Sequence, residues 1–410
     1  MSSRAVPSPL VLIGRVFLPF AAGYYLSYLL RTVNAVISPD LTRELGLGAA
    51  DLGLLTSTYF FAFALAQIPV GIALDRYGPR RVEATLLMVT ALGAALFATG
   101  DGLPALAGAR ALIGLGVSAC LMASLKGFML WFERDRLASL TGYVMSSGAL
   151  GAVTASAPLE AALPFVGWRG AFWAVAGLSA AVAALIFFVM PEKEEAHPHE
   201  SLQHALRGVR EVLSAAVFWR FAGQSAFFTG GFMALQGLWA VPWLMEVDGY
   251  SRALAADHLF WLNIGLLAGQ LAIGAWALPL AARGVTPLRL MQSGLLATMI
   301  VEALIIAGIG PTRVLWCALG VMTASGAQMY GVLAGLFPLH LAGRVTTSIN
   351  LMAFVGAFVV QWGLGGLLDG LRADGMGAAD SLRVAFVILL AAQLASFVPL
   401  VGAGRQRAAG

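Results

Sequence analysis

Long apolar segments recur along the whole chain and constrain its fold more than any other feature. Each runs for about 20 residues or more, the length that a helix needs to cross roughly 30 Å of hydrocarbon. We place twelve of them, at 11–37, 51–74, 82–100, 104–131, 137–160, 168–190, 217–245, 254–281, 287–308, 311–337, 342–368 and 381–403. Because helices satisfy their own backbone hydrogen bonds in lipid, the pattern predicts an all-α membrane protein with twelve transmembrane helices.

The charged residues predict how these helices are oriented. Only 11% of the residues are charged, against about 25% in ordinary soluble domains. Of the 25 lysines and arginines, roughly 16 lie on one side, in the two tails, in alternate loops and at the helix ends next to them, and about 6 lie on the other side. Basic residues collect on the cytoplasmic side, so we expect both termini in the cytoplasm and a multi-pass protein of the plasma membrane, the inner membrane in a bacterium. This asymmetry explains the basic composition without nucleic acid as a partner.

One hydrophilic stretch, residues 191–216, divides the chain into two parts with six predicted helices each, 1–190 and 217–410. Within it, residues 202–213 carry apolar side chains at near-helical spacing. We expect a short amphipathic helix there, lying at the inner membrane surface.

Few residues suit metal binding or catalysis. The two cysteines, Cys120 and Cys317, both fall inside predicted helices. We therefore expect neither a disulfide nor a thiolate metal site. The membrane segments also lack a nucleophile and base in a catalytic arrangement, so we expect no enzyme activity, no cofactor and no metal.

A charged segment joins the second and third predicted helices. It reads Gly71-Ile-Ala-Leu-Asp75-Arg76-Tyr77-Gly78-Pro79-Arg80-Arg81. We expect Gly78 to form the tight turn and Gly71 to allow close helix contact. Arg76, Arg80 and Arg81 can pair with Asp75, with nearby acids or with lipid phosphates. The arginines alone would also suit a role in fixing topology, but an aspartate at this corner is not needed for that.

This segment resembles the loop between helices 2 and 3 of the major facilitator superfamily of transporters. Two further patterns resemble motifs of the same family: Arg110-x-x-x-Gly114 in the fourth helix, and Trp168-Arg169 at the start of the sixth. The resemblance implies two pseudo-symmetric six-helix bundles with the substrate site between them. It also implies that the segment around Asp75 acts as a latch, which holds the cytoplasmic side closed in one state.

Polar residues in the first helix predict a binding site. Tyr24, Tyr28, Arg31 and Asn34 follow at steps of four, three and three, so they share one helix face. A guanidinium offers a planar fork of donors that suits a carboxylate or a phosphate. Lys126, in the fourth helix, is a second cation for such a cavity, unless its side chain extends to the cytoplasm.

The surroundings of Arg31 also carry a resemblance. Tyr28-x-x-Arg31 resembles a segment of organophosphate and organic-anion carriers, in which the arginine meets the anionic group of the substrate. Anion:cation symporters have an aspartate before this arginine, whereas this chain has Leu30.

The second half contributes uncharged candidates. Phe232, Gln236 and Trp239 recur at steps of four and three in the seventh helix, and Gln328 and Asn350 lie in the tenth and eleventh. An amide and aromatic wall opposite Arg31 would suit a small organic anion with an apolar body. Trp239 and the nearby Trp243 would also fit the aromatic belt at the outer membrane interface.

We therefore interpret the chain as a transporter, secondary active or facilitative, that moves a small organic anion by alternating access as a monomer. A proton-coupled exporter of amphipathic drugs is the alternative, but such exporters usually have buried carboxylates, which are scarce in these helices. A copper importer would need paired soft ligands in the seventh and eighth helices. Met233 and His258 are followed four residues later by Gly237 and Leu262 instead. Import, export and a coupling proton are all compatible with this pattern.

Overall fold

The computed structural model describes residues 9–133, 136–191, 202–338 and 341–403. In this part of the chain, nine continuous helical stretches are long and apolar enough to cross a membrane. The longest, α3 (Ala49–Thr99), holds two of the predicted helices, because the backbone turns at Gly78 with φ 79°. The turn predicted at Gly78 is thus confirmed. Because α3 holds two predicted helices, the nine stretches account for ten of the twelve. The remaining two, the predicted fifth and seventh helices, are also helical.

The first half consists of six crossings. The described part begins with a short helix, α1, and a π-helical turn. The six crossings that follow are α2, the two arms of α3, α4 together with α5, α6 and α7. Their bounds are α1 (Pro9–Leu12), α2 (Leu18–Leu45), α4 (Leu103–Val117), α5 (Cys120–Trp131), α6 (Leu137–Thr154) and α7 (Ala157–Val189). Helix α7 kinks at Gly167, where φ is 65°.

The second half repeats this arrangement with more interruptions. Its bounds are α9 (Ala216–Gln224), α10 (Gly230–Ala234), α11 (Ala240–Glu246), α12 (Arg252–Ala282), α13 (Pro287–Ala307), α14 (Thr312–Thr323), α15 (Gln328–Ala334), α16 (Ala342–Ala373) and α17 (Ala378–Ala403). The seventh crossing, expected as one regular helix, is broken by π-helical turns at Ser225–Thr229 and Leu235–Trp239. Such turns are rare and frequently mark functional sites.

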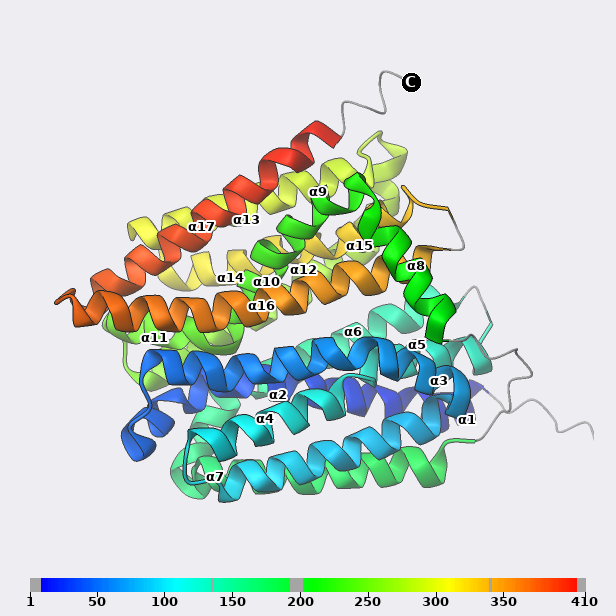
Figure 1. Ribbon diagram of the computed structural model, residues 1–410, viewed down its shortest axis with the longest axis horizontal. Helices are drawn as coiled ribbons and strands as arrows, with labels where there is room; N and C mark the ends of the chain where they lie inside the picture. Colours follow the sequence, from blue (N-terminus) through cyan, green and yellow to red (C-terminus); the bar gives the residue numbers. More distant parts are fainter. Residues whose placement is uncertain (1–8, 134–135, 192–201, 339–340, 404–410) are drawn as a thin grey trace, which may run out of the picture.

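The two halves lie side by side, with the blue and cyan helices of the first half in one layer and the yellow to red helices of the second in the other (Figure 1). Large apolar side chains face outward, among them Phe165, Phe188 and Val398 at 88%, 78% and 69% exposure. An apolar exterior of this kind suits lipid as the solvent.

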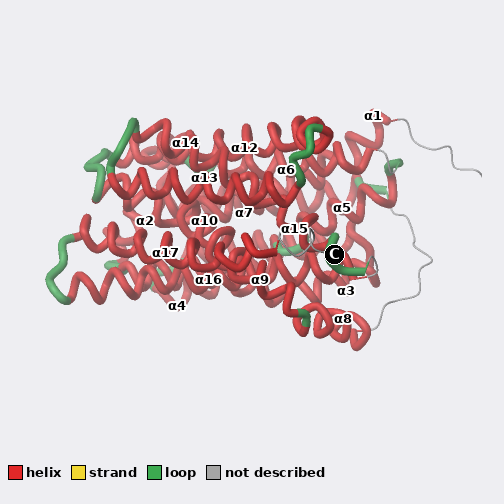
Figure 2. The backbone as a smooth tube through the Cα atoms, turned by 90° about the horizontal axis from the view of Figure 1, so that it is seen from above, coloured by secondary structure: helices red, strands yellow, loops and turns green. Residues whose placement is uncertain are grey.

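We call the end of the bundle that carries Asp75–Arg81 the signature end, and the other end the opposite end. The linker helix α8 (Leu202–Ser214) lies at the signature end, close to α16 (Figures 1 and 2). The predicted helix of the linker is therefore present, with Val212 fully buried. Residues 192–201 of the linker lie outside the described residues.

Candidate functional site

Arg31 lies on α2 in the middle of the bundle and is only 5% exposed. The carbon of its guanidinium group lies 4.4 Å from the ring centre of Tyr28, 5.4 Å from that of Phe354 and 6.0 Å from that of Phe63. Ring faces attract a cation, and they replace part of the hydration that Arg31 loses. Its Nε has no hydrogen-bond partner among the described residues. The site therefore holds a buried positive charge, and the N–H group at Nε of Arg31 is available to donate a hydrogen bond to a ligand.

Two rings cover Arg31 from different halves of the molecule. Phe63 of α3 stacks on Phe354 of α16, with ring centres 4.0 Å apart and planes 18° apart. Gln67, one turn beyond Phe63, and Thr347, two turns before Phe354, both line a cavity at the signature end. The stacked pair thus lies between Arg31 and that cavity.

The cavity has a volume of about 500 Å³ and is bounded by both halves and by α8. Its lining residues are Gln67, Ile68, Gly71, Ile72, Asp75, Met122, Val209, Gly343, Arg344 and Thr347. The prediction that Gly71 allows close helix contact is wrong, because a β-carbon at this position would meet no atom within 4 Å. Gly71 faces the cavity instead.

Motif residues position the backbone on both sides of Arg31. Arg110 of α4 is fully buried and donates from Nη1 to the carbonyl of Leu30, at 2.9 Å. Gly114, one turn further, lies so close to α3 that a β-carbon would collide with the backbone of Tyr59. The hydroxyl of Tyr59 in turn donates to the carbonyl of Ser27, at 3.1 Å. These contacts hold the turn that carries Arg31.

The other residues of the predicted stripe divide between two environments. Tyr24 and Tyr28 pack edge to face, with ring centres 5.2 Å apart, next to Arg31. Asn34 instead donates to the hydroxyl of Thr56 on α3, at 2.9 Å. Tyr24 and Tyr28 thus border the site, while Asn34 serves helix packing within the first half.

Gln236 and Asn263 join the second half to the first. The side chain of Gln236 donates to Asn263 at 2.7 Å, and Asn263 donates to the carbonyl of Ala152 on α6 at 3.1 Å. A β-carbon on Gly237 would lie 3.2 Å from the carbonyl oxygen of Arg31. The π-helical turn at Leu235–Trp239 is therefore packed directly against the backbone of Arg31.

The remaining candidates of the second half differ in burial and in their partners. Phe232 and Trp239 are 8% and 2% exposed, and Trp243 is fully buried. Both tryptophans lie inside the protein, so the interpretation as an interfacial belt is wrong. Asn350 accepts a hydrogen bond from Tyr330 at 2.9 Å, whereas Gln328 is half-buried at the start of α15.

Lys126 lies away from Arg31. Its Nζ forms an ion pair with Asp75 at 2.6 Å, between α5 and the signature loop. Lys126 was expected beside the substrate, but in this structure it neutralises the aspartate of the signature loop. Of the loop arginines, Arg80 donates to the carbonyl of Phe187 at 2.8 Å, and Arg76 and Arg81 are exposed.

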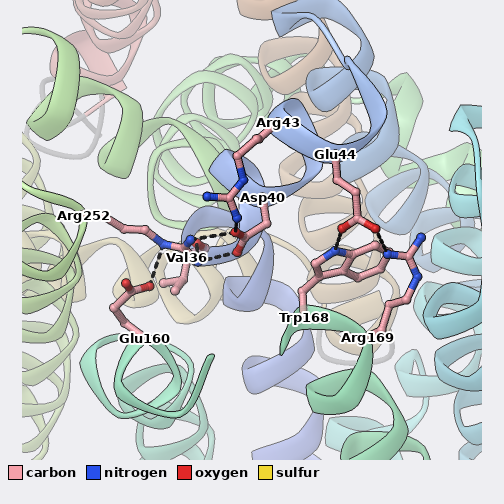
Figure 3. A network of polar contacts seen from close by, with 8 residues as sticks. All are labelled: Val36, Asp40, Arg43, Glu44, Glu160, Trp168, Arg169 and Arg252. Atoms are coloured by element: carbon pink, nitrogen blue, oxygen red, sulfur yellow. Dashed lines mark hydrogen bonds and ion pairs between the residues drawn. The ribbon is translucent and has the colours of Figure 1, made fainter. Parts of the chain in front are cut away.

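The opposite end is closed by charged contacts between the halves. Arg252 of α12 donates to both oxygens of Asp40 on α2, at 2.9 and 2.6 Å, and to Glu160 on α7, at 2.7 Å. Figure 3 shows this network and, beside it, Glu44, which accepts hydrogen bonds from Trp168 and Arg169 within the first half. Trp168 and Arg169 thus tie α7 to the end of α2.

A second contact between the halves lies at the start of α3. The carboxylate of Asp369, on α16, accepts hydrogen bonds from the backbone nitrogens of Ala49 and Ala50, at 3.2 and 2.8 Å. The sequence patterns predict no role for Asp369 or Arg252. The signal that could have identified Asp369 and Arg252 is weak, since both lie at ordinary helix ends.

The relatives of the chain are transporters. A family model described as Major Facilitator Superfamily matches residues 20–361. The chain is 24% identical over 388 residues to a probable L-galactonate transporter of Escherichia coli, covering 88% of this chain and 83% of the relative. It is 23% identical over 203 residues to a probable sulfoacetate transporter of Cupriavidus necator, where the match spans 47% of the relative. A match to the hexuronate transporter of Escherichia coli is 25% identical and covers 56% of each chain.

Solved structures support the same fold. A bacterial homolog of the human lysosomal transporter Spinster, in an inward-facing and unoccupied conformation, superposes with a TM-score of 0.75 at 18% identity and covers 97% of this chain and 98% of that one. With two six-helix halves, the motif residues at their helix contacts and a family model that covers most of the sequence, the chain belongs to the major facilitator superfamily of membrane transporters.

Proposed function

We propose that the chain carries a small organic anion across the membrane, and that Arg31 binds the anionic group. The observation that carries this proposal is the buried guanidinium of Arg31 with its unpartnered Nε, enclosed by aromatic rings of both halves. A charge inside a membrane protein is costly, so it is retained where it has a function. The relatives named for galactonate, sulfoacetate and hexuronate all handle organic anions, which supports the same substrate class.

We further propose that the signature end faces the cytoplasm, following the excess of basic residues on that side. The cavity would then open inward, with the opposite end closed by Arg252 and Asp369. In this state Asp75 pairs with Lys126. The latch function of the signature loop requires that Asp75 finds a different partner when the cavity closes.

Thermal stabilisation of the purified carrier tests the substrate class. A ligand that binds the folded state raises its apparent stability by mass action. Galactonate, galacturonate, sulfoacetate and glucose 6-phosphate should stabilise the protein, and cationic dyes should not. Stabilisation by the dyes alone would favour the exporter of amphipathic drugs and end the anion proposal.

Substitution of Arg31 tests the site itself. Arg31→Gln should lose about 1.5–3 kcal/mol of binding free energy, the rough contribution of a hydrogen bond to a charged group. Arg31→Lys should also bind more weakly, because an ammonium cannot reproduce the planar fork. Arg313→Gln is the matched control, since it removes an arginine that pairs with Asp257 within the second half, outside the site and the signature loop. Uptake of the stabilising anion into proteoliposomes measures each variant, and full uptake by Arg31→Gln would contradict the proposal.

A further inference from the structure

Glu83 is a buried carboxyl group that the binding of an anion leaves unexplained. It lies on α3, four residues after Pro79 of the signature loop, and is fully buried. Neither of its oxygens has a hydrogen-bond partner among the described residues. An unpaired carboxylate in such a place costs several kcal/mol, so the group is neutral when enclosed.

The surroundings of Glu83 connect it to the helix of the candidate site. Gly23 of α2 faces the carboxyl so closely that a β-carbon there would collide with Oε1 of Glu83. The next residue along α2 is Tyr24, which packs on Tyr28, the ring beneath Arg31. The position of α2 at Gly23 therefore depends on the space that the Glu83 carboxyl occupies.

The titratable neighbours of Glu83 are few. From α5, the thiol of Cys120 lies next to its carboxyl, without the geometry of a full hydrogen bond. Lys126, further along the same helix, is paired with Asp75. No cation among the described residues pairs with Glu83, so its charge can be removed only by a proton. Met122, on the same helix α5 as Cys120, lines the cavity at the signature end, so this helix borders the cavity with another of its faces.

We propose that Glu83 is a proton-binding site that couples transport to protons. A proton binds to the carboxylate when a rearrangement of α2 admits water, and Glu83 is enclosed as the neutral acid against Gly23 in the state seen here. Release of that proton to water restores the carboxylate and its need for hydration, which disfavours the same packing of α2. This proposal rests on the carrier function but not on the anionic class of the substrate.

Infrared spectroscopy of the reconstituted carrier without substrate tests the protonation. Wild-type protein should show a carboxylic acid C=O band that disappears as the pH rises, and Glu83→Gln should lack this band while remaining folded, because the amide is isosteric with the neutral acid. Glu302→Gln is the matched control. Glu302 is also a buried acid, 2% exposed, but it lies on α13 in the second half. Because Glu302 can contribute a carboxylic acid band of its own, the decisive comparison is between Glu302→Gln and the double variant Glu83→Gln/Glu302→Gln. A titrating band of equal intensity in these two proteins would overturn the proposal.

Transport of D-galacturonate into proteoliposomes tests the coupling. In Glu83→Gln, a pH gradient should no longer drive accumulation of galacturonate, while exchange of galacturonate across the membrane without a gradient should continue. Glu302→Gln should retain both activities. Gradient-driven accumulation by Glu83→Gln, or its loss in Glu302→Gln as well, would contradict the assignment. If wild-type protein does not transport galacturonate, the choice of anion is wrong, and the substrate-free infrared result alone decides the role of Glu83.

Discussion

At the scale of single residues, Arg31, Glu83 and Arg110 are buried in the first half, and each is accommodated in a different way. Arg110 is held by the carbonyl of Leu30 and by the rings of Tyr59 and Phe97, whose centres each lie 5.7 Å from its guanidinium carbon. Arg31 relies on the rings of both halves, and Glu83 lies enclosed without a charged partner. Only Arg110 has a contact that suits a purely structural role. Arg31 and Glu83 are the groups whose burial calls for a function.

The small residue at position 114 permits the contact on which Arg110 depends. Gly114→Ala should lower thermal stability by about 1–3 kcal/mol, the usual cost of overpacking, because the methyl group would collide with the backbone of Tyr59. Gly108→Ala on the same helix is the control, since a β-carbon there meets no atom within 4 Å. Thermal unfolding in detergent measures both. Equal stability of the two variants would show that α3 and α4 tolerate separation.

At the scale of helices, the first arm of α3, before the turn at Gly78, is held at both ends by groups from elsewhere. Its first backbone nitrogens bind the carboxylate of Asp369 on α16, and Lys126 of α5 binds Asp75 near its turn. The start of a helix carries partial positive charge, so an aspartate there is stabilising. Because α3 and α16 belong to different halves, this contact can exist only while the opposite end is closed.

Asp369→Asn should therefore favour opening at the opposite end. The loss of a charge at a helix start is worth about 0.3–2 kcal/mol, and about 1 kcal/mol shifts a two-state population roughly fivefold. Spin labels at the exposed residues Thr42 and Ala373 would report a longer distance in the variant, in a background with Cys120 and Cys317 replaced by alanine. Asp374→Asn, at an exposed position near the end of α16, should leave the distance unchanged. An unaltered distance in Asp369→Asn would assign the cap to stability alone.

At the scale of the whole molecule, the halves touch at the opposite end and part around a cavity at the signature end. Arg252 connects them through three contacts, since its guanidinium binds Asp40, Glu160 and the carbonyl of Val36 (Figure 3). Side-chain exposure is low, at 22% for Arg252 and 11% for Asp40. A cycle of alternating access must break and remake this network.

Arg252→Gln should open the opposite end and slow transport. Removing one partner of a buried charge pair costs about 2–5 kcal/mol, largely because the other charge stays buried without compensation. The same spin labels should report the longer distance as the main population, and uptake should fall with it. Arg313→Gln is the control, because Arg313 pairs with Asp257 within the second half. Wild-type distances and uptake in Arg252→Gln would exclude Arg252 from the gate.

The sequence by itself determined the elements and the family, because both depend on local patterns. Apolar length specifies a spanning helix, Gly78 specifies the turn of α3, and the motifs at Arg110 and Trp168 mark fixed helix contacts. The stripe on α2 likewise identified Arg31, since helical spacing places its residues on one face.

The partners of the charged residues were decided only by the tertiary structure. Lys126 and Asp75 are 51 positions apart in the sequence, and Arg252 lies 212 positions from Asp40. Glu83 appeared in the sequence as one more acid near a helix end, and its burial follows from the approach of α2 at Gly23. Spacing along one helix shows which face a side chain occupies, but the chemistry of that face is set by the helix that packs against it.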